Sequence, residues 1–83
     1  MRQNNDELDL LHQLGKRVAY LRKRKGMSQL ELSLSTGISK THLSDIECGR
    51  RNPSLLTLGT IAQGLGVTLE ELFRGFVSLE ELL

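Results

Sequence analysis

The chain has 83 residues, of which 39% are hydrophobic and 25% are charged, and it contains one proline and one cysteine. This length and composition are typical of one globular domain with a single modest core. No apolar run approaches the ~18 residues that a membrane-spanning helix needs. A lone cysteine excludes an internal disulfide and fits a reducing compartment, so we expect a soluble cytoplasmic protein.

The charges are distributed unevenly, although the formal net charge is only +1. Residues 16–51 hold nine Lys and Arg against three Asp and Glu, whereas residues 53–83 hold one against four. This asymmetry favours a surface for a polyanion in the first segment and a different task in the second. A basic helix end without any ligand is the alternative, because cations also suit the negative end of a helix dipole.

Apolar residues recur at three- and four-residue spacing along most of the chain, which is the helical period. Leu14 and Val18 are examples near the start, and no segment sustains the alternation of a β-strand. We therefore expect an all-α fold, with a flexible segment at 1–7, one domain at 8–75 and an apolar tail at 76–83. The expected helices cover residues 8–25, 29–36, 40–47, 55–65, 69–74 and 79–82.

Start and stop signals frame these helices. A serine or threonine followed three residues later by glutamate predicts a capping box, in which each side chain bonds the other residue's backbone amide. Glycine after the last apolar residue predicts a helix end, where a left-handed backbone is often required. The expected capping boxes pair Ser28 with Glu31, Thr68 with Glu71 and Ser78 with Glu81. Further expected N-caps are Ser39 and Ser54, and the expected stops are Gly26, Gly37, Gly49, Gly66 and Gly75.

The inward faces of these helices are expected to form the core, which is a more common role for such residues than a binding stripe. Gly59 and Gly64 lie inside an expected helix, where each costs up to about 1 kcal/mol relative to alanine. Close helix approach would explain these glycines, and a tolerated loss is the alternative. The expected core residues are Val18, Leu21, Leu32, Leu43, Ile46, Leu58, Ile61, Ala62, Leu65, Val67, Leu69 and Leu72.

Residues 28–49 carry the strongest functional signal, because two short expected helices there are separated by a turn at Gly37. On the second helix, one lysine and several small polar residues fall within an arc of about 140°, opposite Leu43 and Ile46. A short polar helix braced by another fits the major groove of DNA. The outward arc contains Lys40, Thr41, Ser44, Asp45 and Cys48.

Several roles are open to the residues of this arc. Lys40, in the first turn, is the best candidate for guanine O6 or N7. Thr41 and Ser44 suit phosphates, base edges or a thymine methyl equally well. Asp45 is repelled by phosphates, so it either accepts from a cytosine amino group or is neutralised by a neighbouring cation. The candidate cations are Lys40, Arg50 and Arg51.

Basic and polar residues on both sides of this segment are expected to contact DNA phosphates, and backbone amides at helix starts add neutral donors. Such contacts orient a protein on the duplex without specifying a sequence. The expected phosphate contacts are Arg22, Lys23, Lys25, Gln29, Arg50, Arg51 and Asn52.

Four short motifs lie between residues 14 and 74, namely Gly26-Met-Ser-Gln29, Gly37-Ile-Ser39, Leu43-Ser-Asp-Ile-Glu47 and Gly49-Arg-Arg-Asn-Pro53. Their pattern resembles the Cro/C1-type helix-turn-helix family, which includes phage repressors and the controller proteins of restriction–modification systems. The stretch Glu47-Cys-Gly-Arg-Arg-Asn52, followed by Ser54-Leu55, looks most like the controller proteins.

This resemblance implies a five-helix fold like that of lambda repressor, to which the present chain adds a short C-terminal helix. The third helix would lie in the major groove and the second would brace it. The family pattern pairs Arg22 with Glu47, tying the first helix to the third, and leaves the arginine facing the DNA backbone. It also puts Gln29 near a phosphate or an outer base. The family's base- and backbone-reading positions are Ser39, Lys40, Thr41, Ser44 and Asp45.

A homodimer is expected, because one small domain reads few base pairs and paired half-sites lie about 34–36 Å apart. Folding of the tail onto its own domain is the alternative. The expected partners are a palindromic double-stranded DNA operator and a second copy of the chain. Leu30 and Leu34 are expected to be covered either by the N-terminal residues or by another protein, such as RNA polymerase. The expected interface residues are Leu55, Leu56, Leu69, Phe73, Phe76, Val77 and Leu79.

No enzymatic activity, cofactor, metal site or small-molecule ligand is expected, because two distant histidines and one cysteine make neither a catalytic nor a metal-binding set. The sequence thus predicts a sequence-specific transcriptional regulator. A controller protein that autoregulates its own gene is the closer hypothesis. The alternative is an antitoxin-type interaction module that also binds DNA.

Overall fold

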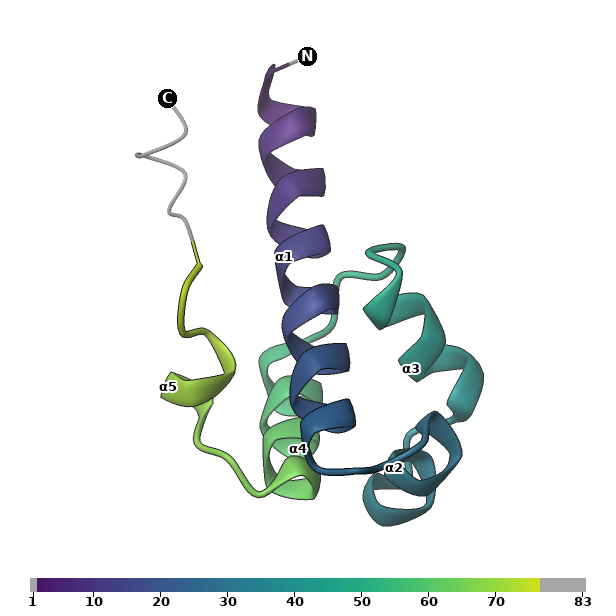
Figure 1. The fold of residues 1–83 in the computed structure, drawn as a ribbon. Coiled ribbons are helices and arrows are strands. Elements are labelled where there is room, and N and C mark those ends of the chain that lie inside the picture. The colour runs from purple at the N-terminus through teal and green to yellow at the C-terminus, as the bar shows by residue number, and fades with distance from the viewer. Residues whose placement is uncertain (1, 77–83) are drawn as a thin grey trace.

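The computed structural model describes residues 2–76, with side chains described from residue 9 onward. This part of the chain forms five helices and no strand, which confirms the expected five-helix, all-α fold. The helices are α1 Arg2–Arg24, α2 Gln29–Thr36, α3 Lys40–Glu47, α4 Leu55–Leu65 and α5 Leu69–Leu72. Figure 1 shows α1 standing between α5 on one side and the α2–α3 pair on the other.

The outer helices depart from the expected boundaries. Helix α1 begins at Arg2 rather than near residue 8, so most of the segment expected to be flexible is helical. Residues 2–7 are polar, so they show no apolar period that would predict a helix. The sequence also has no glycine or proline before Gly15, so nothing in it stops the helix from extending to Arg2. Helix α5 ends at Leu72, two residues earlier than expected. The helix expected at 79–82, with its capping box, lies outside the described residues.

Short-range hydrogen bonds set the starts of the inner helices, as expected. In the first capping box, the amide of Glu31 donates to Ser28 Oγ over 3.0 Å and the Ser28 amide donates to Glu31 Oε1 over 2.8 Å. Thr68 and Glu71 form the same reciprocal pair at 3.0 and 2.9 Å. The predicted caps Ser39 and Ser54 also accept from the third helical amide. All five predicted stop glycines have positive φ, between 71° and 84°.

The core lies where α1, α3 and α4 converge with single residues from α2 and α5. Eleven of the twelve predicted core positions are confirmed: nine are buried, and Leu21 and Val67 pack against the core at its edge. Leu69 is the incorrect prediction, since it is 38% exposed. Helix α5 has a single turn, and Leu72 alone carries it into the core. The fully buried residues are Val18, Leu32, Leu43, Ile46, Ile61 and Leu72.

Two glycines allow helices to approach closely. A Cβ atom at Gly15 would lie 2.6 Å from the carbonyl oxygen of Ile46, so only glycine lets α1 cross the end of α3 here. A Cβ atom at Gly64 would lie 2.5 Å from Thr36 Cγ2, which supports close approach of α4 to α2 as the explanation of that glycine. Gly59 has open space around it, so close approach does not explain it.

A side-chain contact ties α5 to α1. Arg17 donates from Nε and Nη2 to the carbonyl oxygen of Glu71, over 3.1 and 2.7 Å. The same carbonyl also accepts from the amide of Arg74 over 3.3 Å, so Arg17 adds further donors to a carbonyl at the end of α5. Among the described residues, no helix is long and apolar enough to cross a membrane.

Candidate nucleic-acid interface

Helix α3 presents a polar face to the outside and an apolar face to the core. The hydroxyl of Ser39 accepts from the amide of His42 over 3.1 Å, which starts the helix at Lys40. Leu43 and Ile46 are fully buried on the inner face. The outer face is open, since Ser39, Lys40 and Thr41 are exposed and Ser44 and Asp45 are half-buried.

A shallow hollow of about 250 Å³ lies over this outer face, and we call it the recognition hollow. It joins the start of α2, the outer face of α3 and the loop that follows α3. Four of the five predicted base-reading residues line it, whereas Ser39 does not. Its lining residues are Gln29, Lys40, Thr41, Ser44, Asp45 and Arg50.

A buried ion pair beneath the recognition hollow holds α1 against α3. Arg22 donates from Nε to Glu47 Oε2 over 2.7 Å and from Nη2 to Glu47 Oε1 over 3.0 Å. Its third nitrogen, Nη1, donates to the carbonyl oxygen of Met27 over 2.8 Å. The hydrogen bond to Glu47 raises the pKa of Arg22 above its ordinary value. The pairing implied by the family resemblance is therefore present.

The same contacts correct the expected role of Arg22. Its side chain was expected to face the DNA backbone, but the residue is only 8% exposed and all three guanidinium nitrogens are engaged inside the protein. Gln29 joins this network, because its Nε2 donates to Glu47 Oε1 over 3.0 Å. Arg22 thus braces the recognition helix rather than offering a free cation to phosphates.

Asp45 is neutralised by the loop that follows α3. Arg50 donates from Nε and Nη2 to Asp45 Oδ1, over 3.3 and 3.1 Å. Arg51 Nη2 lies 3.5 Å from Asp45 Oδ2. Of the alternatives that the sequence left open, the structure supports neutralisation by these two arginines. Arg50 was expected at a phosphate, yet it lines the recognition hollow beside Asp45.

The titration of Asp45 offers a test of this cluster. The hydrogen bond from Arg50, and then the charges of both arginines, hold the pKa of Asp45 below its usual range. The unfolded chain then binds a proton more readily, so the stabilisation is complete above the ordinary pKa of about 3.9 and is lost as pH falls through the folded value. We expect Asp45→Asn to be less stable than wild type at neutral pH, and the difference to shrink in acid. Urea unfolding at several pH values measures this, and a difference that is independent of pH would contradict the assignment.

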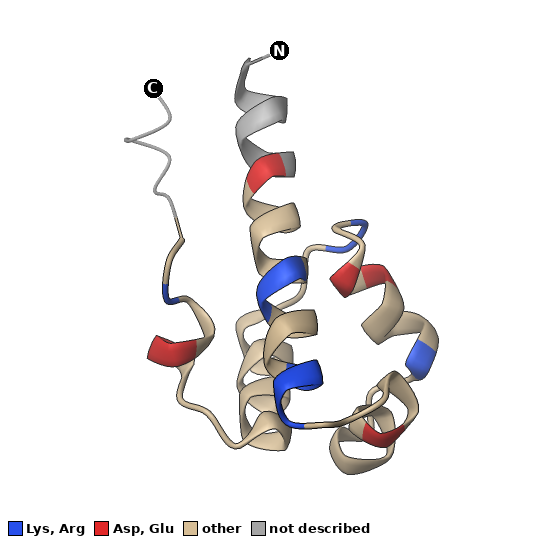
Figure 2. Cartoon of the chain, in the orientation of Figure 1, with Lys and Arg blue, Asp and Glu red and all other residues tan. Residues whose placement is uncertain are grey.

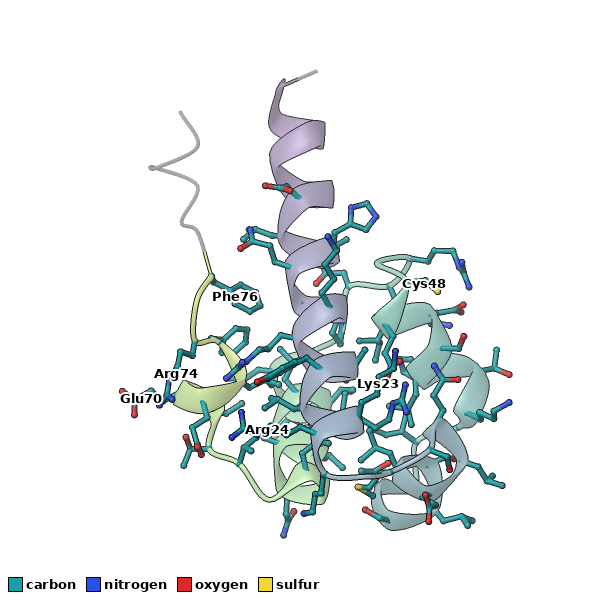
Figure 3. The ribbon with its side chains drawn as sticks, viewed as in Figure 1. Lys23, Arg24, Cys48, Glu70, Arg74 and Phe76 are labelled. Carbon is teal, nitrogen blue, oxygen red and sulfur yellow. The ribbon has the colours of Figure 1, made fainter. Side chains whose placement is uncertain are left out.

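The basic residues at and just after the C-terminal end of α1 do not share one face of the molecule. Figure 2 shows positive charge on the C-terminal half of α1, at the start of α3 and in the loop after it. In Figure 3, Lys23 is drawn on the side of α1 nearer α3 and Arg24 on the side nearer α5. Lys25, expected at a phosphate, lines a separate hollow of about 470 Å³ between α1 and α5, which shares no residue with the recognition hollow.

Several residues at the C-terminal end of α3 and in the loop after it are exposed. Arg51 and Asn52 are exposed in the loop after α3, where they were expected to contact phosphates. Cys48 caps the C-terminal end of α3 as an exposed free thiol. Within the described residues, no group of three His, Cys, Asp or Glu side chains is arranged to hold a metal ion.

The helix-turn-helix geometry, with α2 bracing an outward-facing α3, defines a class of protein, and comparison with known families agrees. Residues 18–72 match the helix-turn-helix family model, and this chain belongs to that family. The resemblance to the Cro/C1-type family is thereby confirmed.

The relatives of this chain include proteins named as HTH-type transcriptional regulators and as control proteins. It is 43% identical over 65 residues to the HTH-type transcriptional regulator y4dJ of Sinorhizobium fredii, covering 78% of this chain and 84% of that protein. It is 41% identical over 66 residues to the control protein C.MunI of a Mycoplasma species, and the match covers 78% of this chain and 89% of that protein. The crystal structure of the restriction–modification controller protein C.AhdI from Aeromonas hydrophila superposes with a TM-score of 0.74 at 35% identity, covering 76% of this chain and 96% of that one.

Proposed function

We propose that this protein is a sequence-specific regulator of transcription that binds double-stranded DNA as a homodimer on a palindromic operator. The observation that carries the proposal is the recognition hollow on the outer face of α3, which is open and lined by polar and basic side chains. A helix braced in this way fits the major groove, where base edges distinguish all four base pairs.

The finer proposal is a controller protein of a restriction–modification system that autoregulates its own gene. Its support is the similarity, over most of both chains, to proteins described as controllers. Selection of bound sequences from random duplexes, at stated salt, tests the DNA-binding proposal. Enrichment of a palindrome that also lies upstream of the protein's own gene supports the full proposal, whereas failure to enrich any sequence contradicts it.

Apolar side chains outside the core support the homodimer. Leu55 and Leu56, in the first turn of α4, are 66% and 84% exposed. An apolar hollow of about 530 Å³ nearby is lined by Pro53 and Leu58 together with Phe73 and other residues of α1 and the C-terminal part. Exposed apolar area of this kind is typical of a protein interface. Of the other expected interface residues, Val77 and Leu79 lie outside the described part of the chain.

A second apolar pair suggests a further protein contact. Leu30 and Leu34 are 53% and 76% exposed on α2, one helical turn apart. This exposure is the support for the expected contact with RNA polymerase at an activated promoter. An antitoxin-type role would instead require a different protein on the apolar tail at residues 76–83, and co-purification of that partner in equal amount would favour it.

Phosphate contact by the loop after α3 gives a salt-dependent prediction. Arg51 is exposed and does not line the recognition hollow. We expect Arg51→Ala to weaken binding to every DNA sequence and to reduce the slope of log affinity against log salt by about 0.9, the value for one lost phosphate contact. Filter binding or fluorescence anisotropy at several salt concentrations measures the slope. An unchanged slope would place this side chain away from the phosphates.

Base contact by Lys40 gives a sequence-dependent prediction. Lys40 is exposed at the start of α3 and lines the recognition hollow. We expect Lys40→Ala to relax the preference at one base pair of each half-site, with a loss of about 1–3 kcal/mol of discrimination. Competition between operators that differ at single base pairs measures this. An equal loss of affinity for all sequences would assign Lys40 to the backbone instead.

A further inference from the structure

We propose that Arg50, held in place by Asp45, reads a guanine in the major groove, and that Asp45 is a positioning residue rather than a base reader. This inference rests on the proposed DNA-binding function. It changes the expected role of Arg50, which was expected at a phosphate, and of the two alternatives left open for Asp45 it takes neutralisation rather than base contact.

The turn at Gly49 brings Arg50 back beside α3. Gly49 has a φ of 75°, and a Cβ atom there would lie 2.5 Å from Cδ2 of the His12 ring. A side chain at this position is therefore disfavoured both by the backbone conformation and by the packed imidazole. The amide of Arg50 then donates to the carbonyl oxygen of Asp45 over 2.8 Å, which closes the turn.

Asp45 engages only one edge of the Arg50 guanidinium. Nε and Nη2 both donate to Oδ1 of Asp45, over 3.3 and 3.1 Å. The hydrogen bond to Asp45, and then the nearby Cys48, raise the pKa of Arg50. A guanidinium has five N–H donors in a planar fork, and its end edge, formed by Nη1 and the second hydrogen of Nη2, is not engaged by Asp45. Two parallel donors on one edge match the two acceptors O6 and N7 that guanine presents in the major groove.

The position of Arg50 distinguishes it from Arg51. Arg50 lines the recognition hollow together with Lys40 and Thr41, whereas Arg51 does not. The side chains of Arg50 and Arg51 are 62% and 49% exposed, so exposure does not separate them. The difference is in their contacts: Arg51 approaches Asp45 only to 3.5 Å, whereas Arg50 is oriented by two shorter hydrogen bonds of 3.3 and 3.1 Å.

A charge-matched pair of variants tests the assignment to Arg50. The preferred sequence of the wild-type protein is first selected from random duplexes, and each base pair is then varied singly. We expect Arg50→Lys to lose about tenfold of the preference for one guanine, the effect of one bidentate contact, while the salt slope stays unchanged. Arg51→Lys is the control, and it should leave every base preference in place.

The outcomes separate the two proposals. If the wild type enriches no sequence, the proposed function fails and the role of Arg50 fails with it. If the wild type enriches a sequence but Arg50→Lys keeps every guanine preference, only the inference about Arg50 is overturned. Replacing the assigned guanine by 7-deazaguanine, which lacks N7, should weaken the wild type and leave Arg50→Ala unaffected.

The positioning role of Asp45 has its own readout. Asp45→Ala should lower the preference for the same guanine as Arg50→Lys does, while non-specific DNA binds more tightly because a carboxylate has left the phosphate surface. A merely structural role would not change base preference and non-specific affinity in opposite directions. Retention of the guanine preference in Asp45→Ala would overturn the role, provided that thermal unfolding shows the variant to be folded.

Discussion

Replacement of Glu47 by alanine is expected to lower the free energy of unfolding by about 3 kcal/mol, at the lower end of the range for breaking a buried ion pair. The substitution leaves the guanidinium of Arg22, which is 8% exposed, without its carboxylate. The lower end applies because Gln29, which shares this carboxylate, lines an open hollow where water enters. Urea unfolding followed by circular dichroism measures the change.

Two further variants make this result interpretable. Glu31→Ala removes an exposed carboxylate from a capping box, and its loss should be smaller. The double variant Arg22→Met with Glu47→Leu replaces both charges by apolar groups and should recover much of the lost stability, because no charge stays buried without a partner. A loss for Glu47→Ala no larger than that for Glu31→Ala would show that the pair does not hold α1 to α3.

Replacement of Leu56 by aspartate is expected to abolish the homodimer and to weaken binding to the palindromic operator by about 100-fold or more, because two linked half-site contacts become one. Leu56 is 84% exposed, so the monomer should fold normally. Sedimentation or light scattering measures the mass, and anisotropy on full and half operators measures the affinity.

The matched control for this variant is Leu34→Asp. Leu34 is 76% exposed and lies on α2, away from the proposed interface. Its replacement by aspartate introduces the same negative charge as Leu56→Asp. It should leave the dimer intact. A wild-type protein that is monomeric at micromolar concentration and binds a half-site as tightly as the palindrome would contradict the dimer.

The boundaries of the three inner helices and the start of α5 could be read from the sequence to the residue, whereas the boundaries of α1 and the end of α5 could not. Helices α2, α3 and α4 begin at serine caps, and both α2 and α4 end at a left-handed glycine. Caps and turns depend on hydrogen bonds within about four residues, so the sequence contains the whole signal. The sequence at the start of α1 offers no such cap, and residues 2–7 are polar, so no apolar period marks this part of the helix.

The sequence by itself determined the fold class, most of the core and the outward arc of α3, because helical periodicity places those residues on one face. Apart from the pair of Arg22 and Glu47, which the family resemblance implied, only the tertiary structure decided which cation meets which carboxylate. Arg22 and Glu47 are 25 residues apart and meet because Gly15 lets α1 cross α3 closely. Asp45 meets Arg50 because the chain turns back at Gly49. Charge pairing depends on distances of a few ångströms between separate elements, which no local pattern of residues specifies.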